Sequence, residues 1–346
     1  MDKKDEIILQ QLETIRTMTE RNLRSMGGDF WGTPFENVTG APEKKPAPKD
    51  DGGKPAAAQS AEKKADEPEP LPKENLADLQ AELDSYIGLA DVKEEVKNLI
   101  NMVNVYKLRR AHDLPTTDMS LHMVFTGNPG TGKTMMARMM ARIYRSLDIL
   151  SKGQLVEVDR SGLVAGYVGQ TALKTQKVIE KAMGGVLFID EAYALNSKSE
   201  NDFGQEAIDT ILKAMEDHRD DLVVIVAGYT DLMEKFIHSN PGLESRFNRF
   251  LLFEDYSPDE MLAIFRMQCK KGCYQLAEGT EELVRDYINE ENGDPETFGN
   301  ARGVRNCFEH ILVAQNNRLA AMESVTKDDL MTIIPDDVLH ARGKLD

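Results

Sequence analysis

Residues 127–134, GNPGTGKT, leave the chain few choices of fold. The stretch fits G-x-x-x-x-G-K-[ST], follows an apolar run at residues 121–126 and precedes an amphipathic run at residues 135–144. In this setting the glycines let backbone N–H groups, together with the helix N-terminus, face phosphate oxygens. The stretch therefore predicts a strand, a phosphate-binding loop and a helix in direct succession.

The loop also predicts its ligands. We expect Lys133 to reach the β- and γ-phosphates of ATP and Thr134 to coordinate Mg²⁺ through its hydroxyl. A chance match or an inactive loop is the alternative. The apolar run directly before the motif and the amphipathic run directly after it disfavour this alternative. The residues predicted to contact the nucleotide here are Asn128, Pro129, Gly130, Thr131, Gly132, Lys133, Thr134 and Met135.

An acidic pair closes another apolar run. Residues 186–189 are Val-Leu-Phe-Ile, and Asp190 and Glu191 follow directly. At the end of a strand Asp190 can help to hold Mg²⁺, and Glu191 can polarise a water for attack on the γ-phosphate. Such a pair can also be a solvated strand end. Its occurrence together with the phosphate loop predicts hydrolysis of ATP.

Short apolar runs alternate with amphipathic segments through the middle of the chain. The runs lie at residues 121–126, 155–158, 186–190, 222–227 and 250–253. This alternation predicts an α/β fold, a five-stranded parallel sheet with flanking helices. The strand-like runs stop after Tyr256, and Ser257-Pro258-Asp259-Glu260 begins a helical pattern. We therefore expect a large nucleotide-binding domain at residues 76–256 and a small helical lid domain at residues 257–346.

The N-terminal region differs in texture. Apolar residues recur at spacings near three and four from Ile8 to Leu23, so residues 1–30 are expected to hold an amphipathic helix and docking segment. Self-association and recruitment of a specific partner both remain open for it. Seven of the 14 prolines lie between Pro42 and Pro72. Residues 31–75 are therefore predicted to be a disordered linker, because this composition cannot bury enough apolar surface.

Composition limits the function further. With 42 Lys and Arg against 59 Asp and Glu, the net charge of −17 argues against nucleic acid as partner. No apolar run reaches the length of a membrane span, and the first residues lack a signal-peptide core, so we expect no membrane insertion and a cytoplasmic protein. Three cysteines and six scattered histidines offer neither a disulfide framework nor metal spacing.

Together these motifs make residues 83–335 resemble the AAA+ ATPases. The sequences of these motifs are most similar to those of the clade of stage V sporulation protein K. That clade includes red-type (CbbX-like) rubisco activase and an ATPase domain of type VII secretion proteins. The stretches that carry this resemblance are GNPGTGKT, GYVGQTALKT, GGVLFIDEAYAL, FGQEAIDTILKAMEDHRDDLVVIVAGY, NPGLESRF and GNARGVRN. The resemblance implies a P-loop sheet with a C-terminal lid.

The same resemblance assigns several arginines. In GLESRF, Arg246 fits the arginine finger that reaches the γ-phosphate of a neighbouring subunit, and Arg249 is a weaker second candidate. In GNAR, Arg302 fits the second sensor on the lid, with Arg305 as the alternative. An ordinary surface salt bridge is the other interpretation of each. Ile87 and Gly88 match the segment that borders the adenine pocket.

Two further positions follow from the resemblance. The first-sensor slot usually holds a small polar residue, but here it holds Tyr229, and Thr230 is a possible substitute. Tyr167 and Val168, flanked by glycines, match a loop that lines the central pore of a ring and grips a polypeptide. A tyrosine suits such a grip because it offers a large contact area with few rotors. Packing of Tyr167 on the domain face is the alternative.

These features predict an ATP-hydrolysing remodeller, a homo-oligomeric ring (a hexamer by resemblance) that pulls on a protein client. An ATP-gated scaffold with little hydrolysis is the main rival, and rubisco activation is an option in a host with red-type rubisco. A DNA motor is disfavoured by the acidic charge, and a P-loop kinase by Glu191, which suits water as the acceptor.

Overall fold

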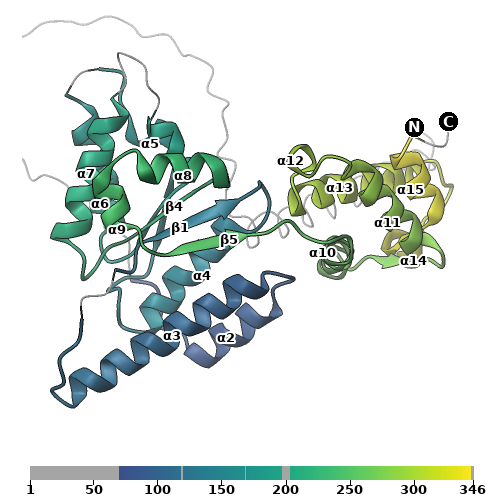
Figure 1. The fold of residues 1–346 in the computed structure, drawn as a ribbon. Helices are drawn as coiled ribbons and strands as arrows, with labels where there is room; N and C mark the ends of the chain where they lie inside the picture. The colour runs from purple at the N-terminus through teal and green to yellow at the C-terminus, as the bar shows by residue number, and fades with distance from the viewer. Residues whose placement is uncertain (1–69, 118–119, 168, 197–202, 344–346) are drawn as a thin grey trace, which may run out of the picture.

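The structure is a computed structural model that describes residues 70–117, 120–167, 169–196 and 203–343. Val168, the predicted N-terminal helix and most of the predicted linker lie outside the described residues. Figure 1 shows a sheet domain and a helical domain, joined where the chain runs from strand β5 into helix α10. Within the described part, no helix is both long and apolar enough to span a bilayer.

Five parallel strands form the sheet of the first domain, as the sequence predicted. In chain order they are β1 (Met123–Gly127), β2 (Leu155–Val158), β3 (Val186–Ile189), β4 (Val223–Gly228) and β5 (Phe250–Phe253). Their spatial order is β2-β3-β4-β1-β5, so β1 lies between β4 and β5. Because all strands run the same way, their carboxyl ends share one edge, where ligands bind in open α/β sheets.

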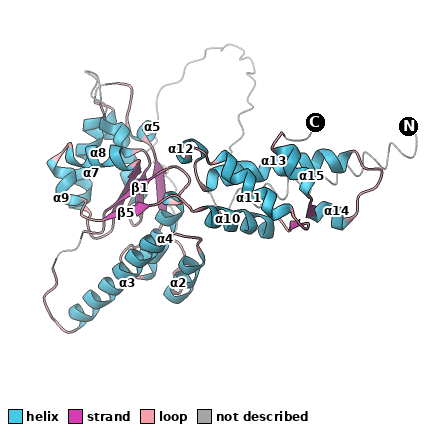
Figure 2. Ribbon diagram, turned by 45° about the vertical axis from the view of Figure 1, so that its right-hand side comes forward, coloured by secondary structure: helices cyan, strands magenta, loops and turns pink. Residues whose placement is uncertain are grey.

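Helices cover both faces of this sheet (Figures 1 and 2). One core joins Phe125 and Phe188 to α2 (Leu76–Ser85), α3 (Ala90–Ala111) and α4 (Lys133–Ser146). The alternate residues Val124 and Leu187 point into a second core, as the period of two along a strand requires. That second core is covered by α5 (Arg160–Leu163), α6 (Thr171–Ala182), the 3₁₀ turn η1 (Ala192–Asn196), α7 (Gly204–Asp217), α8 (Thr230–His238) and α9 (Pro241–Arg246).

The second domain has its own core of buried residues, among them Phe265 and Phe308. Its first helix starts with a capping box at Ser257 and Glu260. Asp337 is buried and accepts hydrogen bonds from Arg318 at 2.8 and 3.0 Å. The elements are α10 (Pro258–Lys271), β6 (Gln275–Leu276), α11 (Thr280–Glu291), α12 (Pro295–Phe298), α13 (Ala301–Ala320), α14 (Lys327–Met331), β7 (Thr332–Ile333) and α15 (Pro335–Ala341).

The lid domain is not purely helical, which corrects one detail of the sequence analysis. Strands β6 and β7 pair in parallel, with Gln275 beside Thr332 and Leu276 beside Ile333. Each strand has only two residues, too few to show the alternation that identifies a strand in a sequence. The pairing links the end of α10 to the segment between α14 and α15 and closes the lid core around Ile333.

Candidate active site at the strand ends

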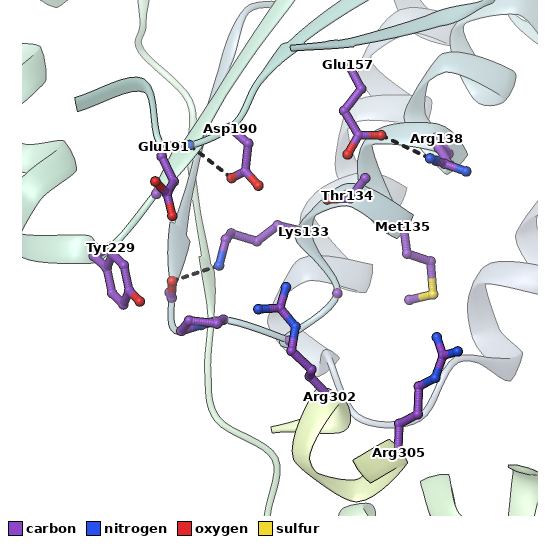
Figure 3. Close-up of a pocket in the computed structure, with 15 residues that line it drawn as sticks. Lys133, Thr134, Met135, Arg138, Glu157, Asp190, Glu191, Tyr229, Arg302 and Arg305 are labelled. Carbon is purple, nitrogen blue, oxygen red and sulfur yellow. Dashed lines mark hydrogen bonds and ion pairs between the residues drawn. The ribbon is translucent and has the colours of Figure 1, made fainter. Parts of the chain in front are cut away.

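A pocket of about 380 Å³ opens at the carboxyl edge of the sheet, between the sheet and the lid (Figure 3). Fifteen residues line it, and they come from the phosphate loop, from the start of helix α4, from three strand ends and from helix α13. They are Gly127, Pro129, Gly130, Gly132, Lys133, Thr134, Met135, Arg138, Glu157, Asp190, Glu191, Gly228, Tyr229, Arg302 and Arg305. The two motifs recognised in the sequence therefore meet in one cavity.

The loop between β1 and α4 has the curled backbone that its glycines permit. Gly127, Gly130 and Gly132 have φ of 141°, 73° and 98°. Glycine adopts these values freely, whereas other residues are strained there. A Cβ atom at Gly127 would lie 2.2 Å from the carbonyl oxygen of Phe253, so the loop also needs glycine to pack against β5. Helix α4 starts at Lys133, and its N-terminus faces the pocket.

Lys133 is a half-buried cation of this pocket. Its Nζ donates hydrogen bonds of 2.8 Å to the carbonyl oxygens of Gly127 and Asn128. Burial lowers the pKa of Lys133 to about 8, an effect that the carboxylate of Asp190 opposes and the guanidinium of Arg302 reinforces. A phosphate placed against Nζ would stabilise the charged form of this side chain.

The acidic pair lies opposite the loop. Glu191 has a left-handed backbone, with φ of 47°, and its N–H donates to Oδ1 of Asp190 at 3.0 Å. Residues held in such sparsely populated conformations cluster at functional sites. Asp190 and Thr134 both line the pocket, and carboxylate and hydroxyl oxygens are the ligands that Mg²⁺ accepts. These two residues therefore fit the metal that the sequence implies.

Helix α13 brings two arginines to the pocket from the lid. Figure 3 shows Arg302 and Arg305 extending from its first turn toward the loop. Arg305 donates to Glu309, one turn further along, at 2.8 Å. Among the described residues the guanidinium of Arg302 has no ion-pair partner. Both candidates for the second sensor thus line the pocket. Of the two, only Arg305 forms an ion pair within the part of the chain that the structure describes.

The two candidates for the first sensor differ in position. Tyr229 follows β4, lines the pocket and lies beside the ring of Tyr193, with 6.2 Å between ring centroids. Thr230 begins α8, is exposed and does not line the pocket. The geometry therefore favours Tyr229 for any contact with a ligand here.

A second cavity of about 440 Å³ adjoins the first and shares Met135 and Arg138 with it. Ile87 lines this second cavity, whereas Gly88 lines neither. Most of its wall is apolar, which suits a flat heterocycle better than a phosphate. Its lining is Glu82, Ser85, Tyr86, Ile87, Met135, Arg138, Met139, Arg142, Tyr256, Ile264, Met267, Lys271 and Ala301.

Two predicted loop residues, Asn128 and Thr131, turn away from the first cavity. The side chain of Asn128 donates to both oxygens of Asp255, at 2.9 and 3.1 Å. Thr131 is fully buried, and its hydroxyl donates to the carbonyl oxygen of Asn128 at 2.8 Å. Both side chains thus hold the loop in shape.

Arg246 and Arg249 lie at the opposite end of the sheet. Both precede β5, and the hydroxyl of Ser120, just before β1, donates to the carbonyl oxygen of Arg246 at 2.8 Å. The guanidinium of Arg246 is paired with Glu216 at the surface. Arg249 is turned onto its own domain, where its Nε donates to the carbonyl oxygen of Ser120 at 3.1 Å. Neither arginine lines the pocket of its own chain.

Tyr167 projects into solvent. Its exposed fraction is 73 %, and Cβ atoms at Gly166 and Gly169 would find nothing within 4 Å. Tyr167 is therefore not packed on the domain face.

Two residues of the pocket escaped the sequence analysis. Arg138 lies one turn after Thr134 on α4, and it forms an ion pair of 3.0 Å with Glu157 of β2. The signal for Glu157 was present in the sequence, because it is the one charged residue in the apolar run Leu155–Val158. Helical spacing from Thr134 would have indicated Arg138.

Comparison with known proteins identifies the class of this chain. Residues 123–255 match the sequence model of the "ATPase family associated with various cellular activities (AAA)", and residues 257–345 match the AAA lid domain. The sheet, its phosphate loop and the C-terminal lid are thus those of an AAA-type ATPase. The chain belongs to the AAA family.

Named relatives confirm the clade that the sequence motifs suggested. The chain is 44% identical over 272 residues to "Ribulose bisphosphate carboxylase/oxygenase activase, chloroplastic" of Cyanidioschyzon merolae, covering 78% of this chain and 92% of that protein. It is 40% identical over 265 residues to "Stage V sporulation protein K" of Bacillus subtilis, covering 76% and 82%. The FIGL-1 AAA domain has a similar fold, with a TM-score of 0.53 at 17% identity, covering 76% of this chain and 83% of that one.

Proposed function

We propose that this chain hydrolyses ATP in the pocket at the strand ends, with Mg²⁺ held by Thr134 and Asp190. The observation that carries the proposal is the meeting of three elements around one cavity: the phosphate loop, the acidic pair and the lid arginines. Four cations, Lys133, Arg138, Arg302 and Arg305, line this cavity and can face the charges of a triphosphate. The apolar cavity beside it takes the adenine, against Ile87 and Met135.

Each side chain then has a distinct task. Lys133 exchanges its bonds to the loop carbonyls for bonds to the β- and γ-phosphates. The metal supplies charge neutralisation on those phosphates. Glu191 orients a water in line with the γ-phosphate and accepts its proton as the water oxygen attacks the phosphorus and the bond to the bridging oxygen of the leaving ADP breaks. Arg302 neutralises charge from the lid side, and Tyr229 borders the position of the water.

We further propose that Arg246 completes the pocket of a neighbouring copy. The five residues of β1 separate the end of the sheet that holds Arg246 from the loop of the same chain, a span of about 16 Å at the usual rise per residue. A finger at that end can act only in trans. Its partial exposure and its pairing with a surface carboxylate, Glu216, keep the guanidinium available at the edge of the domain.

We propose that the protein assembles into a ring of six subunits. The ring then remodels a protein client. The exposed Tyr167 supports this function over a passive ATP-gated scaffold, because a scaffold gives no reason to expose an aromatic side chain between open glycines. A relative named as a rubisco activase favours a protein client as well. Rubisco activation itself is the second candidate for a host that contains red-type rubisco.

Three variants test this proposal. Lys133→Ala is expected to lose ATP binding, whereas Glu191→Gln keeps ATP and loses turnover, because Glu191 acts on the water alone. Arg246→Ala is expected to bind ATP and hydrolyse it poorly. Mixing Arg246→Ala with Glu191→Gln should restore part of the activity, because some contacts then pair an intact Glu191 with an intact Arg246.

The outcomes separate the parts of the proposal. Equal ATP affinity of the wild type and Lys133→Ala, measured by calorimetry, contradicts the role of the loop. A linked dimer with one intact site that remains inactive contradicts the trans role of Arg246. Turnover that no client protein stimulates, and that Tyr167→Ala leaves unchanged, favours the scaffold.

A further inference from the structure

One carboxylate ties the phosphate loop to the lid. Asp255 lies between the end of β5 and the start of α10, where the two domains join. It accepts from the side-chain amide of Asn128 on the loop at 2.9 and 3.1 Å. It also accepts from the side-chain amide of Asn300, the N-cap of α13, at 2.7 Å. Both domains therefore share Asp255.

Asn300 is fully buried and uses both ends of its amide. Besides Asp255, its Nδ2 reaches the carbonyl oxygen of Pro129 in the loop at 3.3 Å. Its Oδ1 accepts from the backbone N–H of Tyr256 in the domain junction at 2.9 Å. One side chain, at the N-cap of the lid helix, thus contacts both the loop and the junction.

The backbone conformation of Asn300 is one that an asparagine adopts only with strain. Its φ and ψ are 54° and −126°, values that belong to the first central position of a type II′ turn. Glycine takes this conformation without strain, whereas an L-residue is strained in it. An asparagine therefore stands at a position where the backbone alone would favour glycine, and its hydrogen bonds offset the strain.

The lid is in direct contact with the loop at this point. The N–H of Ala301 donates to the carbonyl oxygen of Gly130 at 3.3 Å. A Cβ atom at Gly130 would lie 2.1 Å from the carbonyl oxygen of Gly299, so the two backbones touch. Arg302 and Arg305 follow on the same helix, and a shift of the loop therefore moves both guanidinium groups.

We propose that Asn300 is a positioning residue that couples the phosphate loop to the lid. Through Asp255 and Asn128 it fixes the first turn of α13 against the loop, and so places Arg302 and Arg305 at the pocket. The effect on turnover rests on the proposed ATPase function, whereas the effect on the lid position does not.

The experiment measures the distance between the domains. Spin labels are placed on Lys177→Cys of α6 and Lys327→Cys of α14, both exposed positions, in a Cys273→Ser background because Cys269 and Cys307 are buried. Electron–electron resonance then gives the distance distribution without nucleotide and with ADP. Asn300→Gly removes the amide but suits the backbone, so it keeps the fold.

Two further variants serve as chemical tests. Asn300→Asp brings two carboxylates together, and the combination of Asn300→Asp with Asp255→Asn restores a donor and an acceptor to the pair. Asn306→Asp, at an exposed position on the same helix, is the matched control. We expect broad distributions for Asn300→Gly and Asn300→Asp, a narrow one for the control, and a return toward the wild type in the swapped pair.

In the same preparations kcat for ATP should fall by about tenfold in Asn300→Gly and be unchanged in Asn306→Asp. A narrow distribution in Asn300→Gly, or no recovery in the swapped pair, overturns the role of Asn300. If the wild type neither binds nor hydrolyses ATP, the proposed function fails, and the nucleotide-free distances still decide on the coupling.

Discussion

The affinity of this protein for ATP should weaken as pH rises above 8, through deprotonation of Lys133. Burial lowers the pKa of this side chain to about 8 when no phosphate is bound. A triphosphate against Nζ raises the pKa again, so binding takes up a proton wherever the unbound lysine is neutral. The perturbation needs no mutation, because a change of buffer titrates the side chain.

The size of the effect follows from the two protonation states. Between about pH 7.5 and pH 9.5 the charged fraction of the unbound lysine falls from about three quarters to about a thirtieth. If the bound form stays charged, Kd for ATP should rise by about 20-fold, or about 1.8 kcal/mol. Burial raises the pKa of Tyr193 and Tyr256 to about 12, so these phenols do not titrate in this range.

The stability of the unbound protein should increase with pH, whereas its affinity for ATP should decrease. The pKa of Lys133 is lower in the folded chain than the usual value of about 10.4 in the unfolded one, so the unfolded chain binds more protons between the two values. The unfolding free energy should therefore rise with pH across that window. The full change is about 3 kcal/mol.

Titration calorimetry in buffers of different ionisation enthalpy measures both Kd and proton uptake. ATP should take up about half a proton at pH 8 and about 0.9 at pH 9. AMP, which lacks the β- and γ-phosphates, is the control and should show no such uptake. A Kd for ATP that stays level up to pH 9.5, or uptake near zero at pH 9, would refute the assignment of Lys133 to those phosphates.

Three substitutions should change stability. Gly130→Ala should lower it by at least about 1 kcal/mol in thermal denaturation, because the added methyl is strained and meets the backbone of Gly299. Asp337→Ala should destabilise the lid by about 3 kcal/mol, since it removes the buried partner of Arg318; hydrogen exchange in α15 reports this. Leu83→Ala, at a fully buried position, should cost about 2–5 kcal/mol in urea denaturation. A change below about 0.5 kcal/mol in any of them contradicts its reasoning.

Features that depend on neighbouring residues could be predicted from the sequence. The five strands are local apolar runs, and the phosphate loop is a contiguous motif whose glycines adopt the positive φ that its curl needs. Arg302 and Arg305 could not be separated because residues three apart share one face of a helix, and both line the pocket.

Features that depend on tertiary contacts could not be predicted. Asp255 meets Asn128 across 127 positions and Asn300 across 45, and no spacing in the sequence marks such pairs. The ion pair of Arg138 with Glu157 joins a helix to a strand, and its distance depends on how they pack. Strands β6 and β7 form only because the lid core brings two short segments together.

If Arg246 completes the pocket of a neighbouring copy, as proposed, its position at the opposite end of the strands from the pocket governs how activity scales with assembly. Two copies that meet with Arg246 of one against the pocket of the other use different surfaces. The contact is therefore heterologous and can be repeated by a third copy. The number of complete sites then equals the number of contacts and not the number of chains. A pair has one, an open arc has one fewer than its chains, and only closure gives every chain a working site. Specific activity should therefore fall on dilution well before any chain unfolds.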